Sequence, residues 1–359
     1  MRSDDLDYEL PEDRIATDPA EPRDAARLMI VWRRSGRVEH HTVADIPRLD
    51  GVINADDLLI LNRTSVLPAL FFGVRAATGG AVQGIYLRSP EAGCWHVMLE
   101  TRGRLNPGET VRLEPEGELD LIRDLGGGQW QARLQGSHET LEFLRRIGSP
   151  PLPPYIRRRR RRMGRAEVIG ADADRYNTVF ACEPGSVAAP TAALHFTQRL
   201  LDEIEAKGVG RATLTLHIGP GTFAPIRAEE LQDHTMHEEW MTVPARTARA
   251  LARTRRDGGR IIPVGTTCVR ALESLPDSIL RKPQDVCRTT DLFIRPGPDA
   301  PPLRFADALM TNFHLPRSTL LALVATLPDV GIDKLKRWYR IAIDEGYRFY
   351  SYGDAMLLL

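Results

Sequence analysis

Runs of apolar residues divide this chain into two kinds of segment. In the first 60 residues, the runs 27–32 and 58–61 are almost wholly apolar, and such runs predict buried strands. From about residue 68 to 148, short runs with partial alternation of polar and apolar positions are separated by glycine and proline turns. Regularly spaced short strands of this kind predict a small antiparallel β-barrel. We expect its strands at 82–87, 95–99, 110–113, 119–122 and 130–134.

After a stiff proline-rich stretch at 147–156, helical and strand-like patterns alternate. Pro263 predicts that the strand around it lies at a sheet edge or a strand end. Because α and β patterns alternate, this part predicts an α/β domain. We expect a helix that includes residues 200–204 and stops near residues 207–208, further helices at 245–256 and about 268–275, and strands at 213–218 and 260–264.

The strands predicted in the first 60 residues lie outside the barrel segment, so their pairing partners must come from the later α/β part of the chain. We therefore predict an α/β main domain that is interrupted by a small antiparallel β-barrel domain. The main domain is expected to comprise residues 1–67 and 149–359, and the inserted barrel residues 68–148.

Composition narrows the classes of protein that fit. The chain has 359 residues, of which 42% are apolar, and this suits a globular protein of about two domains. No run of about 18 apolar residues predicts a membrane span, and the acidic N-terminal residues do not resemble a signal peptide, so we expect a cytoplasmic protein. The scattered cysteines contain no C-x-x-C pair, so neither a disulfide scaffold nor a thiolate zinc site is expected.

Positive and negative charges balance at 48 each, but one basic run stands apart. A block of arginines suits salt-dependent contacts with RNA phosphates. The alternative is a solvated loop, which is what charge blocks usually form. The candidate RNA-binding residues are Arg157, Arg158, Arg159, Arg160, Arg161 and Arg162.

Segment 183–197 is the strongest candidate for a pocket wall. From Pro184 to Phe196 it has no charged side chain, yet it holds two prolines, a glycine and a histidine. This composition favours neither helix nor strand and predicts an ordered loop of small residues. His195 lies just before a predicted helix, where loops commonly place functional groups.

The predicted strand 213–218 carries a polar face. Thr213, Thr215 and His217 share that face, and a turn rich in glycine follows at 219–223. The pattern fits a strand that ends at a pocket rim. A half-exposed strand with a surface histidine is the alternative.

Two further histidines, His234 and His237, have i,i+3 spacing. The segment lacks the H-E-x-x-H pattern and has no cysteine nearby, so we do not expect a metal there. We interpret the two residues as a hydrogen-bonding pair near a substrate or as a surface turn.

Residues 264–273 follow a strand–turn–helix pattern. Gly265, Thr266 and Thr267 would place free backbone N–H groups and two hydroxyls at a helix start, where a carboxylate or phosphate can bind. Arg270 is close enough in sequence to assist. An ordinary threonine N-cap is the alternative. The pattern is neither a Walker A motif nor a G-x-G-x-x-G fingerprint.

Two polar and aromatic groups lie near the C-terminus. Asn312, Phe313 and His314 come just before a predicted helix whose first turn contains a proline. Segment 347–354 is dense in aromatic residues and ends at a carboxylate. We expect Phe349 to lie in a core strand, and we retain Tyr350, Tyr352 and Asp354 as functional candidates.

Taken together, these motifs resemble the S-adenosylmethionine:tRNA ribosyltransferase-isomerase family of queuosine biosynthesis. The resemblance runs over nearly the whole chain and rests on several long, collinear motifs. They include residues 7–11, 152–156, 185–191, 194–197, 216–223, 234–239, 264–267, 311–320 and 351–356.

The resemblance implies an enzyme with the interrupted α/β fold. Its reaction would move the ribosyl part of S-adenosylmethionine onto the aminomethyl group of 7-aminomethyl-7-deazaguanine at the tRNA wobble position. The product is epoxyqueuosine, and adenine and methionine leave. S-adenosylmethionine is then a substrate, with no true cofactor and no metal needed. We expect a monomer that binds tRNA.

The chemistry suggests roles for the candidate residues. The sulfonium acidifies the 5′ carbon, so one base can take a proton there, and the leaving adenine must be protonated; histidine suits both tasks. We predict that His195, His217 or His314 supplies the base or acid and that Asp354 orients one of them. Gly265, Thr266 and Thr267 would hold a carboxylate or phosphate, and Tyr350 or Tyr352 the unstacked base. The other expected substrate-binding residues are Ser186, Thr191, Thr222, His234, His237, Arg270, Asn312 and Phe313.

The chain departs from the family pattern in its first half. Arg63 replaces an acidic residue, Ser65 and Leu70 replace basic residues, and Asn177 replaces a glutamine. These changes leave two alternatives open. One is a diverged paralogue that transfers the ribosyl group to another acceptor, and the other is a non-catalytic RNA-binding protein.

Overall fold

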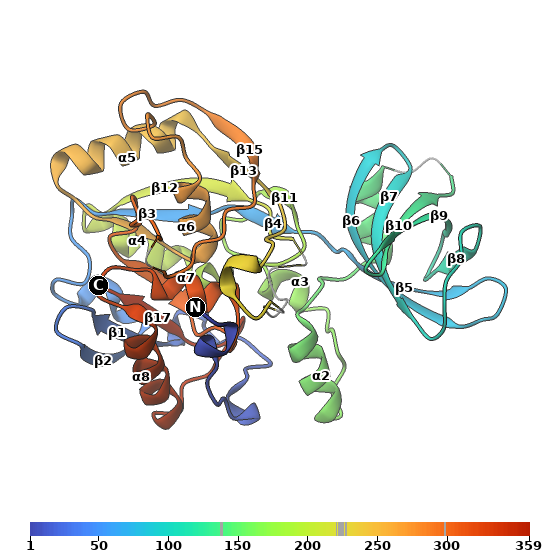
Figure 1. The fold of residues 1–359 in the computed structure, drawn as a ribbon, viewed down its shortest axis with the longest axis horizontal. Helices are drawn as coiled ribbons and strands as arrows, with labels where there is room; N and C mark the ends of the chain where they lie inside the picture. The colour runs from blue at the N-terminus through green and yellow to red at the C-terminus, as the bar shows by residue number, and fades with distance from the viewer. Residues whose placement is uncertain (137–138, 220, 222–225, 227, 298) are drawn as a thin grey trace.

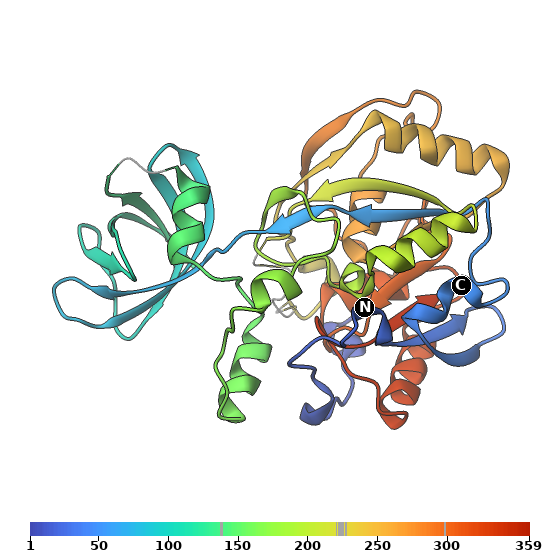
Figure 2. The same ribbon diagram turned by 180° about the vertical axis from the view of Figure 1, so that it is seen from behind.

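The computed structural model describes residues 1–136, 139–219, 221, 226, 228–297 and 299–359. A large α/β part and a smaller barrel lie side by side, joined by a narrow neck (Figures 1 and 2). The predicted fold class, an α/β domain interrupted by a small antiparallel barrel, is confirmed. Within the described ranges, no helix has the length and apolar character needed to cross a membrane.

A five-stranded mixed sheet forms the centre of the larger part, in the order β14-β3-β12-β13-β15. Strands β14, β3 and β12 are parallel, whereas β13 and β15 run antiparallel to their neighbours. Every residue of β3 is buried, which explains its continuous apolar run. Strand β14 lies at the sheet edge, as Pro263 predicted. The bounds are β3 (Leu58–Asn62), β12 (Gly210–Leu216), β13 (Glu239–Val243), β14 (Ile261–Pro263) and β15 (Val286–Thr290).

A second sheet has the order β16-β17-β1-β2. Strand β17 lies between β1, to which it is parallel, and β16, to which it is antiparallel. The early and late segments of the chain therefore meet within one sheet. The bounds are β1 (Arg27–Trp32), β2 (Arg37–Thr42), β16 (Leu309–Asn312) and β17 (Ala355–Leu358).

Helices cover these sheets with their apolar faces. The helix α4 begins after Thr197, whose hydroxyl accepts a hydrogen bond from the Leu200 N–H at 3.1 Å and so caps the helix. The helix α5 ends where Gly258 takes a left-handed conformation, with φ of 81°. The helices are α4 (Gln198–Ala206), α5 (Ala245–Asp257), α6 (Thr266–Glu273), α7 (Thr319–Ala325) and α8 (Gly331–Asp344).

The barrel closes in the order β10-β7-β6-β5-β8-β9, with every neighbouring pair antiparallel. The two chain segments that join the barrel to the larger part lie side by side at the neck, where a Cβ on Gly148 would come within 1.8 Å of the Pro68 carbonyl oxygen. Only glycine permits so close an approach. The elements are β5 (Leu70–Arg75), β6 (Ala81–Glu91), β7 (Cys94–Thr101), β8 (Thr110–Leu113), β9 (Glu118–Gly126), β10 (Gln129–Leu134) and α1 (Thr140–Ile147).

Three local predictions need correction. Segment 183–197 is not wholly a loop, because β11 (Glu183–Ser186) pairs in parallel with β4 (Thr64–Val66) and a 3-10 turn follows. The last three residues of the predicted stiff exit, 154–156, instead begin the helix α2 (Pro154–Arg162), since a proline is tolerated in the first helical turn. Within residues 347–354 the buried Phe349 makes only an isolated bridge to Ile15, and the closing strand β17 starts at Ala355.

Candidate active site

The candidate site lies at the carboxyl ends of the parallel strands β3, β12 and β14. Asn62 ends β3, His217 directly follows β12, and Gly265 lies two residues after the end of β14. Loops at this edge of an α/β sheet commonly form binding sites. The chain segments that carry most of the predicted site residues meet here.

A small cavity of about 30 Å³ lies among four of the predicted segments, 183–197, 213–218, 264–273 and 311–320. It has room for a water molecule and not for a nucleoside, so a substrate would have to enlarge or extend it. The predicted residues at its wall are Thr191, Gly265, Thr266, Thr267, Asn312 and His314.

The Gly265-Thr-Thr turn forms the start of α6, which begins two residues earlier than predicted. Gly265 is the N-cap with φ of 94°, a conformation that favours glycine, and no side chain caps the helix. The alternative of a threonine N-cap is therefore wrong. Both threonines are buried, and Asn62 Nδ2 donates to Thr267 Oγ1 at 3.3 Å. The backbone at this helix start thus keeps the arrangement expected of an anion site.

His195 is buried beside Asn312. The Asn312 Nδ2 group lies 3.2 Å from His195 Nε2 and donates to it, so the imidazole accepts at that nitrogen. Burial lowers the pKa of His195 to about 4, against the opposing attraction of the Asp354 carboxylate. The ring is therefore neutral at pH 7. Asn312 Oδ1 is buried without a hydrogen-bond partner among the described residues, which leaves an acceptor for a ligand.

Both the side chain and the backbone of His314 form hydrogen bonds. Its Nε2 contacts Thr311 Oγ1 at 2.8 Å, and its backbone N–H donates to the Tyr339 hydroxyl at 3.0 Å. The Tyr8 hydroxyl donates to the His314 carbonyl. Burial lowers the pKa of His314 to about 3, so this imidazole is also neutral at pH 7.

His217 is less buried, and its tautomer follows from its neighbours. Thr64 Oγ1 donates its single proton to Ser186 Oγ at 2.8 Å. It must therefore accept from His217 Nδ1, which lies 2.8 Å away, and this leaves the lone pair on Nε2. A Cβ on Gly185 would lie 2.5 Å from His217 Nε2, so only glycine leaves room for the ring. Burial lowers the pKa of His217, and the nearby Glu183 carboxylate partly opposes that shift.

Asp354 does not hydrogen-bond to any of these histidines within the described structure. Its carboxylate instead accepts from the Arg348 guanidinium at 2.9 Å and from the Arg348 and Arg27 backbone N–H groups. Its backbone carbonyl accepts from Asn312 Nδ2 at 3.4 Å. Asp354 is thus linked to His195 by the Asn312 side chain, and its negative charge acts electrostatically on the imidazole.

Four other candidates lie outside the cavity wall. Arg270 forms a buried ion pair with Glu239, whose Oε1 accepts from the Gly219 N–H at 3.0 Å, so this pair holds the turn after β12. Phe313 is fully buried in an aromatic cluster, and Tyr352 donates to Asp172 at 3.3 Å. Tyr350 is 7% exposed and packs on Tyr155.

The side chains of His234 and His237 lie in different environments. His234 is half-buried, with its ring edge-on to Phe293 at 5.3 Å. His237 is exposed beside Gly221, where a Cβ would come within 2.0 Å of His237 Cδ2. Thr222 lies outside the described residues. No cluster of three or more His, Cys, Asp or Glu side chains suited to a metal occurs in the part of the chain that the structure describes.

The arginine run forms α2 and divides into two groups. Arg160 is 1% exposed and forms a bidentate ion pair with the buried Asp172. Arg157 is 7% exposed and donates to Gln83 on the barrel strand β6 at 2.8 Å. These intramolecular contacts occupy both guanidinium groups in this structure. Arg158, Arg161 and Arg162 are exposed, and Arg159 is half-buried.

Sequence reasoning missed several residues that shape the site. Asn62 bridges β3, β12 and α6, accepting from the Leu216 N–H at 3.1 Å and donating to its carbonyl at 3.0 Å. A buried polar residue at the end of an apolar strand is the signal that could have found it. Thr64 was overlooked although it holds His217, and Trp240 and Glu239 were overlooked on β13.

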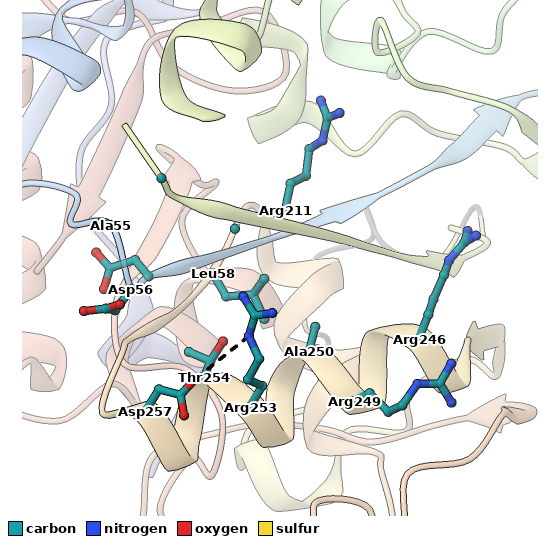
Figure 3. A pocket seen from close by; sticks show the side chains of 13 residues that line it. Ala55, Asp56, Leu58, Arg211, Arg246, Arg249, Ala250, Arg253, Thr254 and Asp257 are labelled. Atoms are coloured by element: carbon teal, nitrogen blue, oxygen red, sulfur yellow. Dashed lines mark ion pairs between the residues drawn. The ribbon is translucent and has the colours of Figure 1, made fainter. Parts of the chain in front are cut away.

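A second hollow of about 390 Å³ lies at the opposite edge of the sheet, where β3 and β12 begin (Figure 3). Four arginines line it, three on α5 and Arg211 on β12, and the Arg211 side chain points away from α5; acidic side chains lie at the other end of the hollow. It contains none of the predicted site residues. The arginines are Arg211, Arg246, Arg249 and Arg253.

The fold and the site define an α/β enzyme with an inserted β-barrel and a histidine-rich site at the carboxyl ends of its strands. A family model described as "Queuosine biosynthesis protein" matches residues 3–358. The chain therefore belongs to the S-adenosylmethionine:tRNA ribosyltransferase-isomerase family of queuosine biosynthesis.

Individual relatives agree over the full length. The S-adenosylmethionine:tRNA ribosyltransferase-isomerase of Rubrobacter xylanophilus is 44% identical and aligns with 100% of this chain and 98% of its own. That of Moorella thermoacetica is 41% identical, with 100% of both chains aligned. The crystal structure of S-adenosylmethionine tRNA ribosyltransferase from Thermotoga maritima has a TM-score of 0.52 at 31% identity, covering 99% of this chain and 100% of that one.

Proposed function

We propose that this enzyme transfers and isomerises the ribosyl moiety of S-adenosylmethionine onto the 7-aminomethyl-7-deazaguanine wobble base of tRNA, giving epoxyqueuosine-tRNA, adenine and methionine. S-adenosylmethionine serves as a substrate and tRNA as the acceptor. The proposal includes a monomer in the cytoplasm that needs neither a metal nor a cofactor. It also includes the domain division at residues 68 and 148.

One observation carries the proposal: three neutral histidines lie at the carboxyl edge of the sheet, beside a helix start that no described side chain caps and an amide oxygen without a partner among the described residues. A sulfonium substrate is cationic, so neutral imidazoles avoid repelling it. The helix start at Gly265 suits the methionyl carboxylate. The Asn312 Oδ1 acceptor suits a donor group of the substrate.

Among the histidines, His217 fits the general base best. Its Nε2 lone pair is set by the chain from Ser186 through Thr64, and its pKa is lowered less far than those of the two deeply buried histidines. A base should titrate near the working pH, so strong burial weakens the candidacy of His195 and His314 for this step. In the proposed step, Nε2 takes a proton from the carbon beside the sulfonium, and the leaving adenine takes up a proton. His195 and His314 then position the substrate through their fixed rings.

The test combines the purified protein, S-adenosylmethionine and precursor tRNA, and it follows adenine release and modified tRNA. We expect both products from wild type and a loss of about 10²–10⁴-fold in kcat for His217→Ala. The matched control is His96→Ala, which removes a histidine from the barrel strand β7. Equal rates for His217→Ala and wild type would contradict the assignment of the base.

A second candidate function concerns the acceptor. Arg63 forms an ion pair with Glu183 at 3.2 Å and donates to Thr215 Oγ1 at 3.3 Å, so one of the unusual residues lies beside His217. A diverged paralogue would use this rim for another acceptor. Adenine release without tRNA modification would favour it, and tRNA binding with neither product would indicate a non-catalytic RNA-binding protein.

A further inference from the structure

Trp240 has an exposed indole at the candidate site. Of the five tryptophans in the sequence, Trp95, Trp130 and Trp338 are at most 4% exposed, whereas Trp240 on β13 is 40% exposed. An exposed indole loses the hydrophobic stabilisation that burial would give. It is therefore a candidate for contact with a ligand.

The indole lies in a row of side chains that crosses three strands. The His217 N–H donates to the Trp240 carbonyl at 2.9 Å, and the two rings stack with centroids 4.9 Å apart and planes 16° apart. On the other side, Trp240 pairs with Thr289 of β15, which is exposed and short. The row therefore places an accessible aromatic surface directly beside the proposed base.

The two tyrosines expected to hold the acceptor base are buried and make contacts with other residues. Tyr352 is 1% exposed and bonded to Asp172, and Tyr350 is 7% exposed against Tyr155. Neither offers a free ring face to an incoming base. An unstacked base in RNA is commonly held on an exposed aromatic ring.

We propose that Trp240 is the stacking surface for the acceptor base of the tRNA, which the base would contact on the indole face turned away from His217. This inference rests on the proposed function for the identity of the base. Stacking tolerates any nucleobase because each has a π-face, so Trp240 supplies affinity and placement and leaves base selection to other groups. The His217 ring covers one face of the indole, and the exposed Thr289 lies on the side where the base would stack.

The experiment compares wild type, Trp240→Ala and Trp240→Phe with two anticodon stem-loop RNAs. One RNA carries 7-aminomethyl-7-deazaguanine at the wobble position, and the other is abasic there. We expect Trp240→Ala to raise the Kd of the first RNA by about 5- to 150-fold and to leave that of the abasic RNA unchanged. Trp240→Phe should restore most of the affinity. Ile341→Ala, which removes an exposed apolar side chain from α8, should change neither Kd.

Two further readouts separate stacking from mere support of His217. Binding of the base-bearing RNA should change the tryptophan fluorescence of wild type, and Trp240→Phe should lack that change. Trp240→Ala should raise KM for tRNA more than it lowers kcat. An unchanged Kd and KM with a lowered kcat and a shifted pH profile would overturn the inference. If wild type binds the base-bearing RNA but forms no product, the proposed function fails while the binding comparison still decides the role of Trp240.

Discussion

At the scale of single residues, the site is built by burial and by fixed hydrogen-bond directions. Three histidines that the sequence singled out lie near one edge of the sheet, but their environments differ. His195 and His314 are deeply buried, and burial strongly lowers their pKa values. His217 is partly exposed, and its hydrogen bond to Thr64 leaves the lone pair on Nε2. This difference was invisible in the sequence, because it depends on neighbours brought in from other segments.

We expect the acid limb of the pH–rate profile to report His217. Its pKa lies below the usual 6.5, so activity should stay constant above about pH 7 and fall as the pH drops through that lowered value. Glu183 raises the pKa of His217, so Glu183→Gln should move the limb to lower pH. The measurement is kcat/KM for tRNA from pH 5 to 8. A limb that moves to higher pH in Glu183→Gln would contradict the assignment.

His195 should make the fold sensitive to acid. Its folded pKa of about 4 lies below the usual value of 6.5, so between these values the unfolded state binds the proton and stability falls as the pH falls. At pH 5 this costs about 2 kcal/mol relative to neutral pH. We expect the difference in the free energy of unfolding between pH 7.5 and pH 5 to shrink by about that amount in His195→Gln. Urea denaturation at both pH values tests it, and an unchanged difference would argue against the shift.

At the scale of elements, the arginines of α2 divide into buried residues that form intramolecular contacts and exposed residues that face solvent. A helix places positions three residues apart on one face, so Arg157 and Arg160 turn inward while their neighbours face solvent. The arginine run was recognised in the sequence, but its division was not. Helical periodicity could not be read from six identical residues, and the partners Asp172 and Gln83 lie in other elements.

Loss of Arg160 should destabilise the protein strongly. Arg160→Gln leaves the Asp172 carboxylate buried without its cation, which costs about 3–5 kcal/mol in the free energy of unfolding. The matched control is Arg162→Gln, which breaks an exposed pair with Glu12 and should cost at most about 1 kcal/mol. Chemical denaturation of both variants checks this. Equal stabilities would refute the structural role of Arg160.

The exposed arginines of α2 are predicted to contact tRNA phosphates. Replacing Arg158, Arg161 and Arg162 with glutamine should weaken tRNA binding and reduce the slope of log K against log salt by up to about 2–3. A control replaces Arg246, Arg249 and Arg253 of α5, which face the hollow at the opposite edge of the sheet. Similar losses in both triple variants would show that general surface charge, and not α2, binds the RNA.

At the scale of the whole molecule, the sequence predicted the architecture better than the site. The switch from long apolar runs to short alternating strands marked the inserted barrel, because strand patterns depend on local periodicity. The contacts of Arg270, Phe313 and Tyr352 could not be anticipated in this way. Each depends on an element distant in sequence, as in the ion pair between Arg270 and Glu239.

We propose that residues 68–148 fold independently. Their apolar core, which includes Trp95, Phe71 and Phe143, forms a cluster separate from those of the larger part. The expressed segment should therefore show a cooperative thermal transition and the near-ultraviolet circular dichroism of ordered aromatic rings. A gradual transition without that signal would contradict the domain division.

The position of β17 has a consequence for biosynthesis. This strand is the last in sequence, yet it lies inside its sheet, hydrogen-bonded to β1 on one side and β16 on the other. Chains synthesised from the N-terminus can complete the barrel early, whereas the larger part must wait for residues 355–358. A ribosome that stalls before β17 is made would therefore leave β1 with an unpaired edge, exposed to aggregation and to proteases. Folding of the candidate site in this way depends on the synthesis of β17.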